Sequence, residues 1–404
     1  MPDIGIVMPV YNQHPPYLQA ALQSVIHQTY QRYQLVIVID GADEKTVQTI
    51  REETAGDSRV TLLFHEKNKG VSQALNTGFT FLFPLPHIRY LTWISSDNVY
   101  YPRFLEALRA KLHAGPPQLG LVYSSFRHVD GEGKSMQTEL DLVRFRKFQQ
   151  KSKEELLDVC FIGVSFMYKK SYAQKIEGYH LEPVEDYEYW LRLTERCEID
   201  YVPEELMDYR VNSAHSVSAR LRKSKQQHRR WRYAFQIARQ QARQRRNIPY
   251  ETTVIFPVYD GIENKTDLME ALLEQYYSNY ELLVVDLSSC TTGEHILKQI
   301  PDPRVTIFTM PNATVKEAVR QTLPRAHTPY VMIHGPRTTW PPLVVWDYLQ
   351  RLVLYARQRH TTEFLSVHYV ARKKEPIQHR FTPLKDEPRF GELYRTDRLM
   401  KILC

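Results

Sequence analysis

Polar side chains that could do chemistry follow four short apolar runs in the first half of the 404-residue chain. Each run is continuous and rich in β-branched residues, which is typical of a buried strand. Ligands of a parallel sheet bind at the carboxyl ends of its strands, so we expect these polar residues to gather at one edge. The segments that hold them are Pro9, Tyr11 and Asn12 at the end of the first run, Asp40 after the second, Asn68 and Gly70 after the third, and Ser96 and Asp97 after the fourth.

The apolar runs alternate with stretches of helical apolar spacing. The runs cover residues 4–10, 35–39, 60–64 and 90–94, and the helical spacing covers 17–28 and 72–83. Strands that alternate with helices are typical of a parallel sheet covered by helices. The sequence therefore predicts an α/β fold that positions the polar residues along one sheet edge.

The second half of the chain repeats the first. Residues 254–259 echo 6–11, 275–286 echo 28–39, 304–306 match 59–61, 330–332 match 90–92, and 394–402 resemble 168–176. A match that keeps its order through four strands indicates an internal duplication. Leu287 stands opposite Asp40, Arg337 stands opposite Asp97, and the second copy stops before anything that corresponds to Asp186. We therefore expect a truncated, degenerate copy that lacks the acids.

Three segments follow from this pattern: residues 1–218, a basic linker over 219–250, and the second copy over 251–404. Between Ala219 and Ile248 the chain has eleven Lys or Arg and no acidic residue. Gln, Ala and Arg favour helices, so this linker is predicted to be helical. A solvated connector is one interpretation, and a surface for anionic lipid or for an acceptor is the other.

The composition limits the partners and the compartment. A net charge of +7 fits an anionic partner, but no nucleic-acid module surrounds the basic run, so we expect no nucleic-acid partner. The four cysteines are widely spaced, which indicates neither a zinc site nor a redox pair. No secretory signal is visible, and no apolar run approaches the about 18–20 residues that cross a bilayer. We expect a cytoplasmic protein that can contact the membrane only peripherally, at its inner face.

Together the motifs resemble the inverting family-2 glycosyltransferases of the GT-A fold, over about residues 3–218. The first strand of that family ends in P-x-Y-N, as Pro9 to Asn12 does here, and Asn68 to Gly78 matches its N-x-G and N-x-G pair. Within the family, residues 96–102 look most like a spore-coat polysaccharide glycosyltransferase. Two positions depart from the pattern, because Ile39 replaces the first of two paired aspartates and Ser95 replaces the first acid of D-x-D.

The resemblance implies a site for a nucleotide-diphosphate sugar. It assigns Asp40 to the nucleotide base and assigns the rest of the nucleotide site to Pro9, Tyr11, Asn12, Asn68, Gly70 and Ser96. Asp97 would bind a divalent cation, Mn or Mg, because oxygen ligands suit these ions. His215 could reach the metal or the diphosphate, and a hydrogen-bonded loop histidine is the alternative.

The acidic pair Glu185 and Asp186 opens a stretch of helical spacing and matches the E-D motif of the family, whose second acid is the general base. Asp186 would take the acceptor proton, and Glu185 would position the acceptor or the loop. Alternatively, the two acids have only a structural role, because negative charges at a helix N-terminus interact favourably with the helix dipole. Gly163 falls where the family lets the acceptor approach the donor, although a glycine in a strand can simply permit close packing.

The resemblance therefore implies an inverting glycosyltransferase that moves a sugar from a UDP- or dTDP-sugar. The acceptor would be a glycan, a cell-envelope polysaccharide or a lipid-linked glycan, and the second copy would support the fold, form a homodimer or dock the acceptor. The competing interpretation is a non-catalytic pseudo-glycosyltransferase that serves as a glycan-binding or assembly scaffold, since one acid of D-x-D is missing. Metal-dependent nucleotide binding separates the two interpretations.

Overall fold

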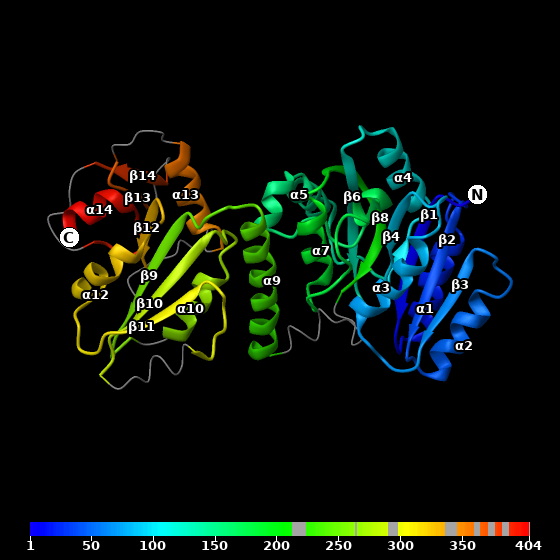
Figure 1. The fold of residues 1–404 in the computed structure, drawn as a ribbon, viewed down its shortest axis with the longest axis horizontal. Helices are drawn as coiled ribbons and strands as arrows, with labels where there is room; N and C mark the ends of the chain where they lie inside the picture. Colours follow the sequence, from blue (N-terminus) through cyan, green and yellow to red (C-terminus); the bar gives the residue numbers. More distant parts are fainter. Residues whose placement is uncertain are drawn as a thin grey trace. The chain divides into compact units, whose positions relative to one another are not determined.

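The computed structural model describes residues 1–211, 224–262, 265–289, 298–335, 346–358, 364–370, 376–381 and 388–403. The chain divides into two compact units, Met1–Ala238 and Arg239–Cys404. Both units are mixed α/β (Figure 1), which confirms the predicted fold class. Each unit is described by itself.

The first unit is built on an eight-stranded sheet with the strand order β3-β2-β1-β4-β7-β6-β8-β5. The strands are β1 Ile4–Val10, β2 Tyr33–Asp40, β3 Val60–His65, β4 Tyr90–Trp93, β5 Val99–Tyr100, β6 Leu119–Val129, β7 Phe166–Lys169 and β8 Glu198–Arg210. Strands β3, β2, β1 and β4 are parallel, so their carboxyl ends lie at one edge, as predicted. β7 runs antiparallel to both β4 and β6.

Helices cover both faces of this sheet. They are α1 Pro15–Ile26, α2 Glu44–Glu53, α3 Val71–Leu82, α4 Phe104–Ala114, α5 Glu139–Gln149, α6 Lys170–Ala173 and α7 Glu185–Leu193, with a 3-10 turn η1 over Lys153–Leu157. Ile4, Ile6 and Met8 of β1 belong to the core that α1, α2 and α4 share. On the other face, Val7 packs against Gly78 of α3, where a larger side chain would collide with it. The alternation of β1 side chains between the two faces therefore fixes a three-layer arrangement.

The described residues of the second unit form a seven-stranded sheet with the order β11-β10-β9-β12-β15-β13-β14. Its strands are β9 Thr252–Val258, β10 Tyr280–Asp286, β11 Val305–Thr309, β12 Tyr330–Ile333, β13 Ser366–Tyr369, β14 Ile377–Arg380 and β15 Leu393–Arg395. Its helices are α10 Lys265–Leu273, α12 Val315–Thr322, α13 Tyr348–Gln358 and α14 Thr396–Leu403, with η2 over Leu323–Arg325. β9, β10, β11 and β12 are parallel, and β15 runs antiparallel to β12.

The pairing register of the two sheets agrees with the alignment of the two sequence halves. In the first sheet Ile4 pairs with both Tyr33 and Tyr90, and in the second Thr252 pairs with both Tyr280 and Tyr330. The antiparallel partners also correspond, since Tyr90 pairs with Lys169 and Tyr330 pairs with Arg395. Aligned positions of the two halves are thus structurally equivalent positions in the two sheets.

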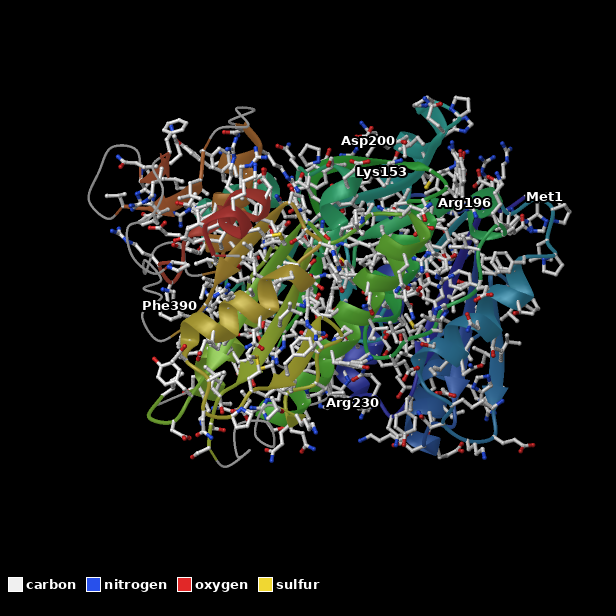
Figure 2. The ribbon with its side chains drawn as sticks, turned by 60° about the vertical axis from the view of Figure 1, so that its left-hand side comes forward. Met1, Lys153, Arg196, Asp200, Arg230 and Phe390 are labelled. Carbon is white, nitrogen blue, oxygen red and sulfur yellow. The ribbon has the colours of Figure 1, made fainter. Side chains whose placement is uncertain are left out.

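A long basic helix, α9 Lys225–Arg245, lies within the stretch predicted to be a helical linker. The division between the two units falls inside this helix. Arg230, labelled in Figure 2, is exposed near its start. Among the described residues, no helix combines the length and the apolar character needed to cross a bilayer.

Candidate functional site

Hydrogen bonds connect the loops that follow β1, β2 and β4. The Asn12 side-chain oxygen accepts from the Asp43 amide at 2.7 Å, and the Gln13 side-chain amide donates to the Ser96 hydroxyl at 3.1 Å. Asp43 in turn caps α2 by accepting from the Thr46 amide. The structure therefore brings Asn12 and Ser96 together at the carboxyl edge of the sheet. Pro9 is half-buried within β1, and Tyr11 is exposed beside this edge.

Asp40 ends β2 and fixes the loop that follows β3. Its carboxylate is buried and accepts hydrogen bonds from the Lys69 amide at 3.0 and 3.1 Å and from the Gly70 amide at 3.0 Å. Nδ1 of His65 lies 2.6 Å from Asp40 Oδ1, and Nε2 of the same ring lies 2.9 Å from the Thr77 hydroxyl. Asp40 thus holds the loop that carries Asn68 and Gly70. We did not predict His65, which faces Asp40 only because β2 and β3 pair at these two residues.

The same loop is connected to the segment before α7. Gly70 has φ 91°, which favours glycine, and a side chain there would lie 2.8 Å from Glu182 Oε1 and would displace that carboxylate. Glu182 accepts from the Ser72 amide at 2.9 Å. Asn76 completes the connection, because its side chain exchanges two hydrogen bonds with the Tyr179 backbone, at 2.7 and 2.8 Å. The N-x-G segment therefore positions the chain that leads into the acidic pair.

Glu185 and Asp186 are the first two residues of α7, as predicted, and both are partly buried. Burial raises the pKa of Asp186, and burial together with the neighbouring Asp186 charge raises the pKa of Glu185. Asp186 Oδ1 accepts from the Tyr187 amide at 2.6 Å, whereas the buried Glu185 Oε2 has no hydrogen-bond partner. Two carboxyl groups with raised pKa values can take up a proton closer to neutral pH than ordinary acids do.

The Arg192 guanidinium holds helix α7 against the preceding segment. Arg192 donates to both carboxylate oxygens of Glu188 at 2.7 Å. The same guanidinium donates to the backbone oxygens of Glu177 at 2.5 Å and Gly178 at 2.7 Å. The Tyr187 hydroxyl also donates to the Leu156 carbonyl. These contacts give the acidic pair a fixed position at the helix start.

Asp97 follows β4 and is half-buried. Its Oδ1 accepts from the Ser95 hydroxyl at 2.6 Å. The loop is braced by Arg210, whose Nε donates to the Asp97 carbonyl at 3.1 Å and whose amide donates to the Asn98 side chain at 3.0 Å. The Arg210 guanidinium also stacks 4.0 Å from the Tyr17 ring centroid. Asp97 is thus presented from a rigid loop.

Asp97 supplies one oxygen-ligand carboxylate for a divalent cation. Within the described part of the chain, no group of three or more His, Cys, Asp or Glu could hold a metal ion alone. His215, the second predicted ligand, lies outside the described residues. The donor set therefore fits a cation that takes its other ligands from a bound diphosphate and from water.

Gly163 lies in the turn before β7, so the expectation of a glycine within a strand is wrong. Its φ is 74°, and a side chain at this position would collide with the Phe126 ring. Phe126 in turn packs edge to face on Phe145 of α5 at 4.9 Å. Close packing explains the glycine, and its role towards an acceptor stays a prediction.

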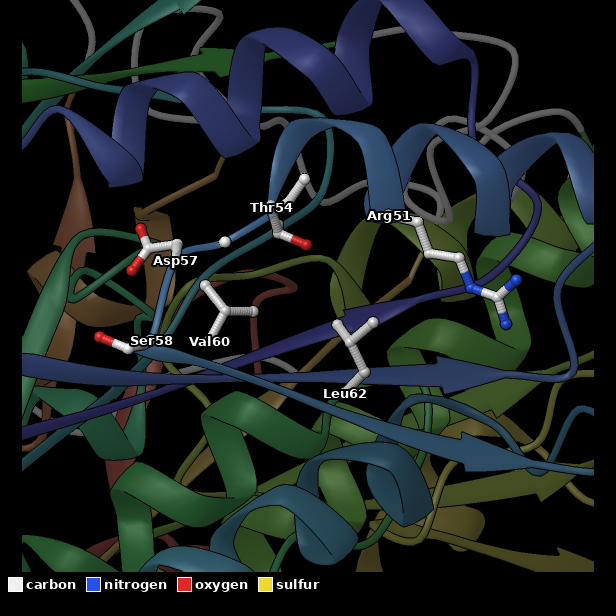
Figure 3. Close-up of a pocket in the computed structure, with 8 residues that line it drawn as sticks. Arg51, Thr54, Asp57, Ser58, Val60 and Leu62 are labelled. Atoms are coloured by element: carbon white, nitrogen blue, oxygen red, sulfur yellow. The ribbon is translucent and has the colours of Figure 1, made fainter.

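A surface hollow of about 450 Å³ lies elsewhere in the first unit (Figure 3). It is lined by Arg51, Thr54, Ala55, Gly56, Asp57, Ser58, Val60 and Leu62. These residues come from the end of α2 and the start of β3, whereas the predicted site lies where the parallel strands end. The hollow therefore plays no part in the candidate site.

Residues 5–177 match the family described as Glycosyl transferase family 2. An uncharacterized glycosyltransferase of Rickettsia felis is 24% identical over 324 residues, which cover 70% of this chain and 52% of that protein. An uncharacterized glycosyltransferase of Methanocaldococcus jannaschii is 23% identical over 227 residues, which cover 55% of this chain and 76% of that protein. The chain thus spans about half the length of the Rickettsia felis relative.

Solved structures show a weaker likeness. The mannosyltransferase PcManGT of Pyrobaculum calidifontis, solved with GDP-Man and Mn²⁺, aligns with a TM-score of 0.45 and 15% identity over 57% of this chain and 63% of that chain. Residues 1–349 of Staphylococcus aureus TarS align with a TM-score of 0.43 and 11% identity over 96% of this chain and 98% of that chain.

Proposed function

Because residues 5–177 place this chain in glycosyl transferase family 2, we propose that it transfers a sugar from a nucleotide-diphosphate donor to a glycan or polysaccharide acceptor, with inversion. The observation that carries the proposal is the acidic pair at the start of α7, a helix that Arg192 anchors through the Glu177 and Gly178 carbonyls. A buried carboxyl group with a raised pKa suits general base catalysis near neutral pH.

Asp186 is the proposed base. The acceptor oxygen attacks the anomeric carbon on the face opposite the diphosphate, its proton moves to Asp186, and the diphosphate leaves with the electrons of the broken carbon–oxygen bond. The Tyr187 amide holds Oδ1, so Oδ2 takes the proton. Glu185 positions the acceptor or the loop.

The nucleotide site is proposed at the carboxyl edge of β1, β2, β3 and β4, and UDP and dTDP are the proposed carriers. Asn12 and Ser96 belong to loops that are hydrogen bonded to their neighbours, so they enter the site already ordered. The Asp40 carboxylate accepts hydrogen bonds from the Lys69 and Gly70 amides. Its proposed contact with the nucleotide base is a second role, in addition to this structural one.

A divalent cation, Mg or Mn, is proposed to bind at Asp97, with His215 as a second proposed ligand. When bound, the cation stabilises the negative charge of the leaving diphosphate. Ser95 supports the site by donating to Asp97 Oδ1.

The second unit is proposed to be a degenerate GT-A copy that supports the fold, forms a homodimer or docks the acceptor. Leu287 is buried where Asp40 lies in the first unit, and the paired strands keep the same register. The acceptor is proposed to be a cell-envelope polysaccharide or a lipid-linked glycan, reached from the cytoplasmic side with the basic segment 219–250 near the membrane surface.

Calorimetric titration with UDP, dTDP, GDP and ADP, with and without Mn, tests the proposal. We expect selective, metal-dependent binding that the Asp97→Ala variant loses. The alternative is a non-catalytic glycan-binding scaffold, which the Ser95 replacement in D-x-D favours. A folded protein that binds none of the four nucleotides would support that scaffold.

A further inference from the structure

Exposed apolar side chains gather on one short segment of the first unit. Met136, Leu140, Val143 and Phe148 have exposed fractions of 53%, 57%, 52% and 39%. Single exposed apolar residues are ordinary on a protein surface, but a cluster on one helix marks a surface that another molecule covers. The last three of these residues belong to α5.

The helical period separates α5 into two faces. At about 100° per residue, Leu140, Val143, Arg144, Lys147 and Phe148 fall on one arc, which we call the outer face of α5. All five are exposed. The opposite side carries Leu142 and Gln149, which are buried, and Phe145, which packs on Phe126. The outer face is therefore a surface of apolar residues interleaved with basic ones.

The two acidic residues of α5 are both in its first turn and border this face. Asp141 forms the capping box with Thr138, and Glu139 is in the same first turn. Arg144 lies 3.7 Å from Asp141 and keeps 70% of its side chain exposed. The last two turns contain Arg144, Arg146 and Lys147 and no acid, so the charge of the outer face is positive.

An apolar stripe flanked by Lys and Arg is typical of a helix that lies in the headgroup region of a bilayer. The apolar side chains enter the acyl boundary, while the long basic side chains extend to anionic headgroups. The net charge of +7 of the chain also favours binding to an anionic surface. An acidic protein would match the basic residues equally well, but it would leave three large apolar side chains without an apolar partner.

The inner side of α5 connects this face to the predicted acceptor side of the site. Phe145 packs on Phe126 at 4.9 Å, and Phe126 fills the space beside Gly163. A helix with its side chains is about 10–12 Å across, so a bilayer on the outer face lies about one helix diameter from the Gly163 turn.

We propose that the outer face of α5 binds the surface of an anionic phospholipid bilayer. This contact goes beyond the transfer reaction, because it requires neither donor nor acceptor. It is also separate from the basic segment 219–250, whose membrane contact was suggested by charge alone. If the proposed transfer holds, the contact keeps a lipid-linked acceptor beside the site.

Co-sedimentation of the full chain with vesicles tests the proposal. Wild type is expected to bind vesicles of phosphatidylcholine with about 30% phosphatidylglycerol, and to bind pure phosphatidylcholine at least about tenfold more weakly. The Leu140→Glu/Val143→Glu variant should lose at least about tenfold in affinity for the anionic vesicles. Arg144→Gln/Lys147→Gln should lose less, and added salt should reduce that difference.

Phe81→Glu is the matched control, because Phe81 is an exposed aromatic residue of α3 in the same unit. It should bind as wild type does. The proposal is overturned if the α5 variants bind like this control, or if only Arg229→Gln/Arg230→Gln on α9 abolishes binding. It is also overturned if the Leu140 and Val143 variant abolishes a dimer seen by light scattering and leaves vesicle binding unchanged, because a second copy of the chain would then occupy the face.

Discussion

The two sheets of this molecule share a framework and differ at the edge where ligands bind. In the first unit the Tyr33 hydroxyl donates to the Val25 carbonyl of α1 at 3.0 Å, and in the second the Tyr280 hydroxyl donates to the Leu272 carbonyl of α10 at 2.8 Å. Arg59 stacks on Tyr33 at 4.6 Å and Arg304 on Tyr280 at 4.4 Å. These interactions fix a helix against the second strand of each sheet.

A buried glutamine completes the common framework. Gln28 accepts from the Leu105 amide at 2.9 Å, and Gln275 accepts from the Leu349 amide at 3.1 Å. Both side chains are almost fully buried. In each unit the glutamine thus satisfies an amide in the helix that packs beside it.

At the carboxyl edge of the parallel strands, in contrast, the two units differ. Asp40 is buried with its carboxylate bonded to the Lys69 and Gly70 amides, whereas Leu287 at the equivalent position is packed in an apolar cluster. The second sheet buries a carboxylate one position earlier, at Asp286, where the Ser288 amide and hydroxyl donate to it, but it has no acid at the position of Asp40. The framework therefore does not require an acid at the Asp40 position, which points to a task for Asp40 beyond folding.

The largest expected effect comes from Asp186→Asn. The amide can still accept from the Tyr187 amide, but it cannot take a proton, so we expect transfer to fall about 10²- to 10⁴-fold. Nucleotide affinity, measured by calorimetry, should stay near wild type. A folded variant that retains transfer, or that loses nucleotide binding, would contradict the proposed role.

The next largest effect is expected when Asp97→Asn in the first unit is compared with Asp260→Asn at the corresponding edge of the second unit. Asp97 is the proposed cation ligand, whereas Asp260 is exposed in the second unit and accepts from the Ser289 amide at 2.9 Å. Asp97→Asn should weaken Mn-dependent nucleotide binding by at least about 10- to 100-fold, and Asp260→Asn should leave it unchanged. Equal losses in both variants would remove the functional distinction between the two edges.

The shared framework predicts a matched pair of smaller effects. Gln28→Ala and Gln275→Ala each leave a backbone amide without its acceptor, at a cost of about 1–3 kcal/mol in the free energy of unfolding. Amide hydrogen exchange at Leu105 and Leu349 reports the two units separately. Each variant should speed exchange in its own unit. If one of the two variants leaves hydrogen exchange in its unit unchanged, the shared geometry does not stabilise both units.

The sequence predicted the regular part of this fold well. Ile4–Val10 is a strand over the full predicted range, and Glu185 begins a helix, because continuous apolar runs and helical spacing are local properties of the chain. The alignment of the two sequence halves also predicted strands that pair in the same register, while the duplication itself stays a prediction.

Long-range side-chain contacts account for what the sequence did not predict. His65 meets Asp40 through strand register, and Glu182 reaches the Ser72 amide across 110 residues of sequence. Neither contact has a local signal in residue spacing. The turn conformation of Gly163 and its contact with Phe126 were missed for the same reason. The segment boundaries at 218 and 250, the site roles and His215 stay predictions.

The smallest effect concerns the pH at which the first edge is active. Burial raises the pKa of Asp186, so the base becomes protonated, and transfer falls, at a higher pH than for an ordinary aspartate near about 3.9. Glu185→Gln should leave this acid limb of the pH–rate profile in place, because burial is the largest cause of the Asp186 shift.

The pH dependence of protein stability tests the raised pKa of Asp186 independently. A carboxyl group whose pKa is raised in the folded state stabilises the fold below its unfolded pKa, and this contribution is lost as the pH rises through the folded pKa. Asp186→Asn should therefore gain stability relative to wild type more at pH 8 than at pH 4, as measured by denaturant unfolding of the first unit. A difference that stays constant across this range would mean that Asp186 titrates like an exposed acid, and the comparison between the two edges would lose its electrostatic basis.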